Sequence, residues 1–375
     1  MNEKEIAEIR RRFRADKSNI THVRGCYVNE KKEIVSSFYQ PVALLPQAES
    51  EALLTILKKT LTGTLGKNLV DISFATQQVV DGPEHKLLMG LRANALRDSD
   101  GVDALFQQII QALDMEGNYL ILLTCDAYDV PYRGKDGEDF DDGATEVYTY
   151  ILCSVCPVKM TKPALSFAVH DNAFHNLSPD WVIAPPELGF LFPAFDERST
   201  NLYGALYYTR DEKNNHPQFA KAVFNAPLLM PAAAQRDTFH TILEESLAED
   251  CRYQVVQAVN DQLRELISEH KENKVREPLT ISGGAMGQML THCGVAEERA
   301  DDFAQRYSDA FGPDTRLSPR NLADTRQLEI AAGEVKIQVS AQRGDLVQTR
   351  LIDGERYILV RAEDMVTVNG VPINF

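Results

Sequence analysis

The sequence predicts an α+β protein with a mostly antiparallel sheet and flanking helices, followed by a helical segment and a C-terminal β meander. Residues 119–125 and 147–155 are continuous apolar runs, rich in β-branched or aromatic residues and too short for typical helices, which favours buried strands. Residues 102–115 carry apolar side chains at the three-four spacing of one helical face. Asp-Gly and Asn-Gly dipeptides near the C-terminus are typical of tight hairpin turns.

The length of 375 residues indicates two domains as a first expectation. The pattern of elements divides the chain further, into an α+β domain at 1–230, a helical segment at 231–326 and a small β meander at 327–375. The sequence leaves open whether the meander is a domain of its own or an extension of the sheet.

The charge balance excludes some classes of partner. Lys plus Arg total 39 and Asp plus Glu total 55, so the formal net charge is −16. This excess repels nucleic acids and anionic membranes, and we expect neither as a partner. The arginines at 10–14 are interpreted as complementing the dipole of their own helix.

The composition also predicts a cytoplasmic protein. No run approaches the ~18 apolar residues of a membrane span, and the N-terminus lacks the basic and then apolar pattern of a secretory signal. Six cysteines are scattered along the chain, and we expect them to be reduced thiols.

The N-terminal part begins with a helix, because Asn2 and Glu5 have the spacing of a capping box. Residues 19–28 and 33–40 are typical of a β-hairpin. A second helix is expected after Pro46, where leucines recur on one face.

The middle of the chain is predicted to complete the sheet. Two further strands of the same sheet are expected at residues 165–170 and 202–209. Between the strands at 119–125 and 147–155, residues 126–146 show no apolar period, which indicates a long loop of the kind that is often functional. Prolines crowd residues 179–193 and indicate an irregular crossing segment.

The second half begins with helices. Residues 232–272 are helical in pattern, with a break near Asp250, and a compact helical pair is expected at 282–293 and 296–311. The C-terminal meander is expected to turn at two dipeptides, Asp353-Gly354 and Asn369-Gly370.

Cys153 and Cys156 form a CxxC motif, a spacing that serves zinc or redox sites. A redox pair needs its first cysteine at a helix N-terminus, whereas both cysteines lie in a predicted strand. Residues three apart on a strand point to opposite faces, so we interpret these cysteines as buried and structural.

The loop at 126–146 is rich in carboxylates. Six of them lie close together: Asp136, Glu138, Asp139, Asp141, Asp142 and Glu146. No register places oxygen ligands where a calcium-binding EF-hand needs them. We therefore interpret the loop as a solvated acidic segment and as the expected contact surface for a basic protein partner.

Two hypotheses for the function follow. The first is a non-enzymatic interaction or regulatory protein, because no residue pattern meets the demands of a catalytic or cofactor site. The alternative is a metal-assisted hydrolase with a carboxylate and histidine site at the strand ends. Its weak candidate ligands are Asp126, Asp129, His170 and His175.

Several stretches resemble the domain-of-unknown-function 4317 family of clostridial bacteria. They are Lys4-Glu5-Ile6 through Arg12-Phe13, Arg24 through Lys32, Thr62 through Leu69, Ile352-Asp353-Gly354, Tyr357-Ile358-Leu359 and Val368 through Val371. The resemblance runs nearly end to end and implies one family unit in a bacterial cytoplasm. It implies no activity, cofactor or catalytic residue.

Overall fold

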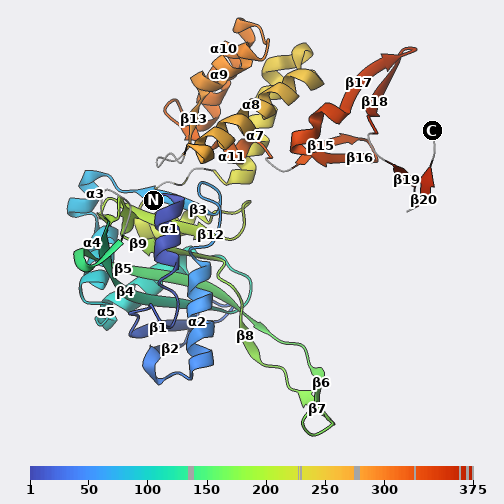
Figure 1. Ribbon diagram of the computed structural model, residues 1–375. Coiled ribbons are helices and arrows are strands. Elements are labelled where there is room, and N and C mark those ends of the chain that lie inside the picture. The colour runs from blue at the N-terminus through green and yellow to red at the C-terminus, as the bar shows by residue number, and fades with distance from the viewer. Residues whose placement is uncertain are drawn as a thin grey trace. The chain divides into compact units, whose positions relative to one another are not determined.

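The computed structural model describes residues 1–133, 139–226, 228, 230–273, 279–324, 327–362, 365–368 and 371–373. The chain divides into two compact units, Met1–Pro231 and Ala232–Phe375 (Figure 1), and each is described by itself. The three-part division suggested by the sequence stays a prediction.

The first unit is built on an eight-stranded antiparallel sheet with the order β2-β1-β4-β5-β9-β12-β3, and β8 pairs with β5 beside this path. Its strands are β1 (His22–Val28), β2 (Ile34–Pro41), β3 (Leu69–Ser73), β4 (Tyr119–Arg133), β5 (Asp139–Met160), β8 (Trp181–Ile183), β9 (Leu188–Phe192) and β12 (Gly204–Thr209). The predicted fold class, with a mostly antiparallel sheet and flanking helices, is confirmed.

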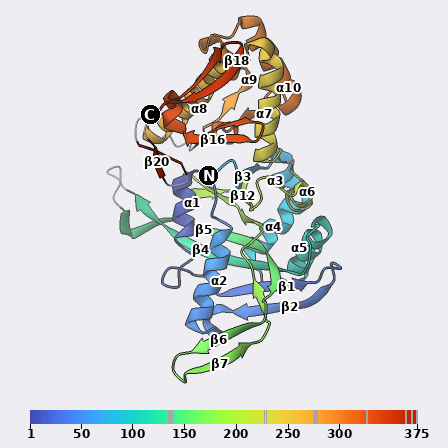
Figure 2. The same cartoon turned by 90° about the vertical axis from the view of Figure 1, so that its right-hand side faces the viewer.

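Helices cover both faces of this sheet (Figures 1 and 2). One face is covered by α1 (Glu3–Arg10) and α2 (Gln47–Lys59). The other is covered by α3 (Thr76–Asp81), α4 (Pro83–Ala93), α5 (Ser99–Ala112) and α6 (Pro217–Phe224). Along β4, Ile121 and Leu123 pack into one core and Leu122 into the other. Burial on both faces explains why this stretch is a continuous apolar run instead of an alternating one.

The predicted elements at the N-terminus are confirmed. The Asn2 side chain accepts hydrogen bonds from the main-chain N–H groups of Lys4 and Glu5, and the Glu5 carboxylate accepts one from the N–H of Asn2. This capping box satisfies donors that the first turn of a helix leaves unpaired. The hairpin forms as β1 and β2, and the second helix begins directly after Pro46.

The prediction of a long loop at 126–146 is wrong over most of that range. β4 continues to Arg133 and β5 begins at Asp139, so the segment forms a long antiparallel ribbon. Tyr128 lies opposite Tyr148 in this register. The ribbon is stabilised by pairing between strands, and its mixture of charged and aromatic residues hides the period of two on which a strand prediction depends.

Two other expectations about the sheet need correction. Residues 165–170 were expected in the same sheet, but the strand found there pairs in a separate two-stranded sheet. Residues 179–193 were expected to be irregular, yet they contain β8 and β9. All five residues of β9 are buried between β5 and β12. Prolines stand before and after β9, so they bound this strand without interrupting it. A short hairpin, β10 (Ala194–Asp196) and β11 (Ser199–Asn201), follows it.

The second unit begins with the predicted helices. They are α7 (Ala232–Leu247), α8 (Tyr253–Glu272), α9 (Gly283–His292), α10 (Glu297–Phe311) and the short α11 (Pro319–Leu322), with the two-residue strands β13 (Ile281–Ser282) and β14 (Arg316–Leu317) paired between them. The break near Asp250 is confirmed, because a short 3₁₀ turn, Ala248–Asp250, separates α7 from α8. Phe239, Phe303 and Leu263 are among the buried residues of this core.

The C-terminal part is antiparallel, as predicted, and consists of separate hairpins. They are β15 (Gln327–Ala332) with β16 (Val335–Ser340), β17 (Val347–Ile352) with β18 (Glu355–Val360), and β19 (Val366–Val368) with β20 (Val371–Ile373). A 3₁₀ segment, η3 (Ala341–Leu346), joins the first two hairpins. Asp353 and Gly354 both have positive φ, as a type I′ turn requires. The dipeptide Asn369-Gly370 lies outside the described residues.

Candidate interaction surface

A β-hairpin projects from the first unit. It consists of β6 (Ala164–Ala168) and β7 (Ala173–Leu177), which pair only as a two-stranded antiparallel sheet. Figures 1 and 2 both show this hairpin, residues 164–177, reaching away from the eight-stranded sheet. We refer to it as the arm.

The arm has one apolar face. Phe167 lies directly opposite Phe174 in the register, and Leu165 is two residues before Phe167 on the same face. The rings of Phe167 and Phe174 are 5.4 Å apart between their centroids. These side chains are nonetheless exposed, by 71% for Leu165, 52% for Phe167 and 71% for Phe174. Val169, just beyond β6, is 80% exposed.

The other face of the arm carries polar groups. Ser166 lies opposite His175, and its hydroxyl donates a hydrogen bond of 3.2 Å to the carbonyl of that histidine. Ala164 and Ala173 share this face, and Asn176 lies opposite Leu165 on the other, so the large apolar side chains that the structure describes gather on one face of the arm. Within the described part of the chain, no further strand pairs with it.

The turn of the arm explains two of the histidines singled out in the sequence. Asp171 accepts a hydrogen bond from the main-chain N–H of Ala173, and its other carboxylate oxygen lies 2.8 Å from Nε2 of His175. Nε2 of His170 is 3.7 Å from the same oxygen. Asn172 occupies the left-handed region with φ of 54°, which asparagine tolerates better than most residues. Asp171 thus organises the turn and brings His170 and His175 together.

An arm of this kind is hard to explain as a self-sufficient structure. An isolated two-stranded hairpin is marginally stable in water. Exposed apolar side chains gathered on one face, with polar groups around them, are typical of surfaces that contact another molecule. The sequence of the arm therefore suits a segment whose apolar face is covered by a partner.

The candidate ligand Asp126 lies in the interior of the first unit. Its carboxylate accepts hydrogen bonds from the Tyr150 hydroxyl at 2.8 Å and from the main-chain N–H of Asn19 at 3.1 Å. Nε of Arg12 is 3.5 Å from the carboxylate, and its guanidinium lies over the ring of Tyr128. Burial raises the pKa of Asp126, and the Arg12 charge and the Tyr150 hydrogen bond lower it in part. These contacts anchor the end of α1 to β4 and β5.

The four candidate ligands do not gather at one place. Asp129 is an exposed residue of β4 and, being three residues from Asp126, points to the other face of that strand. His170 and His175 belong to the arm. Among the residues that the structure describes, no group of three or more His, Cys, Asp or Glu side chains is arranged to hold a metal ion.

The acidic cluster that is predicted to contact a basic partner lies largely outside the residues that the structure describes. Residues 134–138 are not described, and neither are the side chains at 132–145. Glu146 is described, and it accepts a hydrogen bond of 3.0 Å from the N–H of Thr200. A hydrogen bond with the Thr200 side chain and this main-chain bond lower the pKa of its carboxyl.

The CxxC cysteines are buried on opposite faces of β5. Cys153 packs into the core beneath α4 and α5, and Cys156 into the core beneath α1 and α2. Burial raises the pKa of Cys153 well above its ordinary value and that of Cys156 to about 12. Since the thiolate is the reactive form, this environment is opposite to that of a redox pair.

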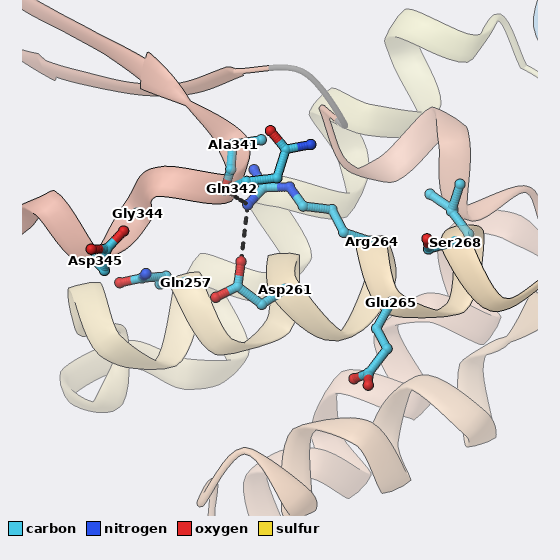
Figure 3. A pocket seen from close by; sticks show the side chains of 10 residues that line it. Gln257, Asp261, Arg264, Glu265, Ser268, Ala341, Gln342, Gly344 and Asp345 are labelled. Carbon is cyan, nitrogen blue, oxygen red and sulfur yellow. Dashed lines mark hydrogen bonds and ion pairs between the residues drawn. The ribbon is translucent and has the colours of Figure 1, made fainter.

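The second unit contains a pocket of about 660 Å³ between α8 and η3 (Figure 3). Its charged lining residues are Asp261, Arg264, Glu265 and Asp345. Arg264 is held by Asp261 and by the carbonyls of Asp324 and Ala341, and Asp345 by Arg343 and Arg361. Figure 3 shows the Glu265 carboxylate directed away from η3. Of these charged groups, Arg264 links α8 to η3, and Asp345 pairs with arginines outside α8.

Sequence reasoning missed the apolar face of the arm. Leu165, Phe167 and Val169 alternate with Ala, Ser and Ala, a pattern that predicts a half-buried strand without identifying what covers it. One available signal was the pair of prolines, Pro163 and Pro179, that bracket the segment and favour its separation from the sheet.

Comparison with protein-family models matches residues 1–371 to one family, described as a domain of unknown function (DUF4317). A search of curated proteins found no match. In the described part of the chain, none of the helices combines the length and the apolar character needed to cross a membrane.

Proposed function

The chain belongs to the DUF4317 family, and on that premise we propose that it is a non-enzymatic interaction or regulatory protein whose arm binds another protein. The carrying observation is the exposed apolar face formed by Leu165, Phe167 and Phe174. Aromatic side chains that become buried at the centre of an interface contribute most to binding energy.

The geometry of the arm supports this role. The two phenylalanine rings are already in contact, so little side-chain freedom is lost when a partner covers them. Asp171 and its hydrogen bonds fix the turn that connects the strands. The arm can therefore present a preformed apolar surface to a groove or to a sheet of the partner.

The acidic segment at 126–146, apart from its buried residues Asp126 and Val130, remains a second proposed contact, directed at a basic surface of the same partner. We also propose the bacterial cytoplasm as the setting, which the family resemblance implies. The sequence supports this setting, because its six cysteines are few and scattered along the chain.

Affinity purification from the source cells, followed by binding measurements with the purified partner, tests this proposal. The informative variant is Phe167→Ser combined with Phe174→Ser. We expect Kd to rise at least ~30-fold, which corresponds to about 2 kcal/mol for two aromatic anchors. The matched control is Val80→Ser, which removes an exposed apolar side chain from α3 and is expected to leave Kd unchanged.

A second pair of variants separates the two proposed contacts. Removal of residues 134–144 should weaken binding in a salt-dependent manner, because it deletes charge. The arm variant should weaken binding equally at low and high salt. The proposal fails if the partner binds the arm variant with wild-type affinity.

A further inference from the structure

The two edge strands of the eight-stranded sheet differ in how well they are protected from pairing with a strand of another molecule. The edge strand β3 has five residues, carries Asp71 and has Leu69 and Ile72 buried. The opposite edge strand β2 has eight residues, of which the first six are exposed. Val35 is 58% exposed and Tyr39 is 51% exposed.

β2 has few of the features that usually protect an edge strand. Residues 34–40 contain no charged side chain, and the one proline is the last residue of the strand. Natural proteins blunt such edges with charges, prolines, bulges or short length, because unpaired main-chain groups are a template for another strand. β2 does have a bulge, at Val35, and residues 36–41 remain in regular register with β1.

Neighbours on β1 hold the side chains of this edge in place. The ring of Tyr39 stacks on His22 with centroids 4.6 Å apart, and the Arg24 guanidinium lies 5.7 Å from its centroid. Phe38 lies across Gly25, where a Cβ atom would fall 1.9 Å from the ring. The surface is therefore ordered before any partner arrives, which lowers the entropic cost of association.

The outward main-chain groups can be assigned from the register. The N–H of Val42 donates to the carbonyl of Thr21. Every second residue before Val42 therefore also directs its main-chain groups toward β1, namely Gln40, Phe38 and Ser36. Ser37 and Tyr39 then direct their N–H and C=O groups away from β1.

A second copy of the chain fits this edge better than an unrelated strand. In a two-fold antiparallel pairing centred on Ser37, Ser36 of each copy lies opposite Phe38 of the other, and all of these residues belong to the regular part of β2. Residues 36–41 contain no charged side chain, so no like charges meet where the two strands pair. For a chain with a net charge of −16, an uncharged strand is where two copies can approach with least repulsion.

We propose that the protein forms a two-fold dimer in which β2 of one copy pairs with β2 of a second copy, joining the two sheets into one. The dimer uses a surface distinct from the arm, so the two proposals can be tested independently of each other.

Sedimentation velocity of the full chain tests the dimer. Ser37 lies on the dyad, so Ser37→Lys places two lysines opposite each other, and Ser37→Glu places two glutamates there. We expect the wild type to be a dimer and each variant to dissociate at least ~10-fold more readily, because like charges that face each other destabilise an interface. An equimolar mixture of the two variants should restore the dimer as a heterodimer.

The control variant is Val80→Lys, which adds the same charge at an exposed position of α3 and should leave the dimer unchanged. Circular dichroism of each variant establishes that the fold is retained. A monomeric wild type at high micromolar concentration overturns the proposal. A dimer that persists in both single variants also overturns it, because the interface must then lie elsewhere.

Discussion

The rings of Phe167 and Phe174 contact each other across the β6–β7 hairpin, with centroids 5.4 Å apart, on a face that leaves both more than half exposed. A pair of this kind ordinarily helps to form a core. In the arm it forms a surface, and that difference motivates the first prediction.

Loss of the arm phenylalanines should cost little stability. Phe167→Ser combined with Phe174→Ser removes exposed side chains, so we expect the free energy of unfolding to change by less than ~1 kcal/mol. Leu123→Ala, in the buried part of β4, should cost about 2–5 kcal/mol by comparison. Urea unfolding of both variants measures the difference. A loss of several kcal/mol in the arm variant would show that the phenylalanines belong to the core.

The stability contribution of Asp126 should depend on pH. Burial raises its pKa above the ordinary value of 3.8, so the folded state binds the proton more tightly than the unfolded chain. The stabilisation that results is present below the unfolded pKa and is lost as the pH rises through the folded pKa. Asp126→Asn cannot ionise, and its side-chain oxygen can still accept the Tyr150 hydrogen bond.

We therefore expect the free energy of unfolding of Asp126→Asn, relative to wild type, to increase as the pH rises above the ordinary pKa of 3.8. Urea unfolding at a series of pH values measures this difference. Asp129→Asn, which makes the same substitution at an exposed position of the same strand, provides the matched control. A relative stability of Asp126→Asn that falls with pH would mean that ionised Asp126 is stabilising through Arg12.

Gly25 should accept a side chain only if the Phe38 ring moves. In Gly25→Ala the new Cβ would overlap the Phe38 ring, which lies 1.9 Å from that position, and we expect a loss of about 1–3 kcal/mol from overpacking. Gly90→Ala, in α4 with open space around the position, should instead gain roughly 0.5–1 kcal/mol from helix propensity. Thermal unfolding compares the two. Recovery of stability in Gly25→Ala combined with Phe38→Ala would confirm the steric cause.

The cysteines should react in the order of their exposure. Cys251 is exposed, whereas Cys153 and Cys156 are buried and burial raises the pKa of both thiols. We expect a thiol reagent to label Cys251 in the folded protein and the other two only after unfolding. Mass spectrometry of the labelled peptides identifies the sites. Rapid labelling of Cys153 in the folded state would contradict the structural interpretation of the CxxC motif.

Local patterns predicted the elements whose signals are themselves local. The capping box at Asn2 and Glu5 and the apolar runs that form the buried parts of β4 and β5 are examples. The strand β9 was missed because its support is distant in sequence. Leu191 of β9 pairs with Leu152 and Leu206 on its two sides, and no local period reports such pairing.

The candidate site was also predictable only where its features are local in sequence. Alternation around Phe167 predicted a strand, but a strand pattern does not state whether its apolar face meets a core or solvent. Asp126 was taken for a ligand because it follows a buried apolar run. Its real neighbours, Arg12 and Tyr150, reach it through tertiary contacts that the sequence does not display.

The proposed role of the arm is tested most directly by photo-crosslinking inside the source cells. A photoreactive amino acid placed at Val169, beside the apolar face, should give one dominant adduct with a single protein, and Phe167→Ser combined with Phe174→Ser should abolish it. The same amino acid at Val80 should give no such adduct. If Val169 yields no specific adduct, or one that survives loss of both phenylalanines, the arm is not the surface through which the protein acts.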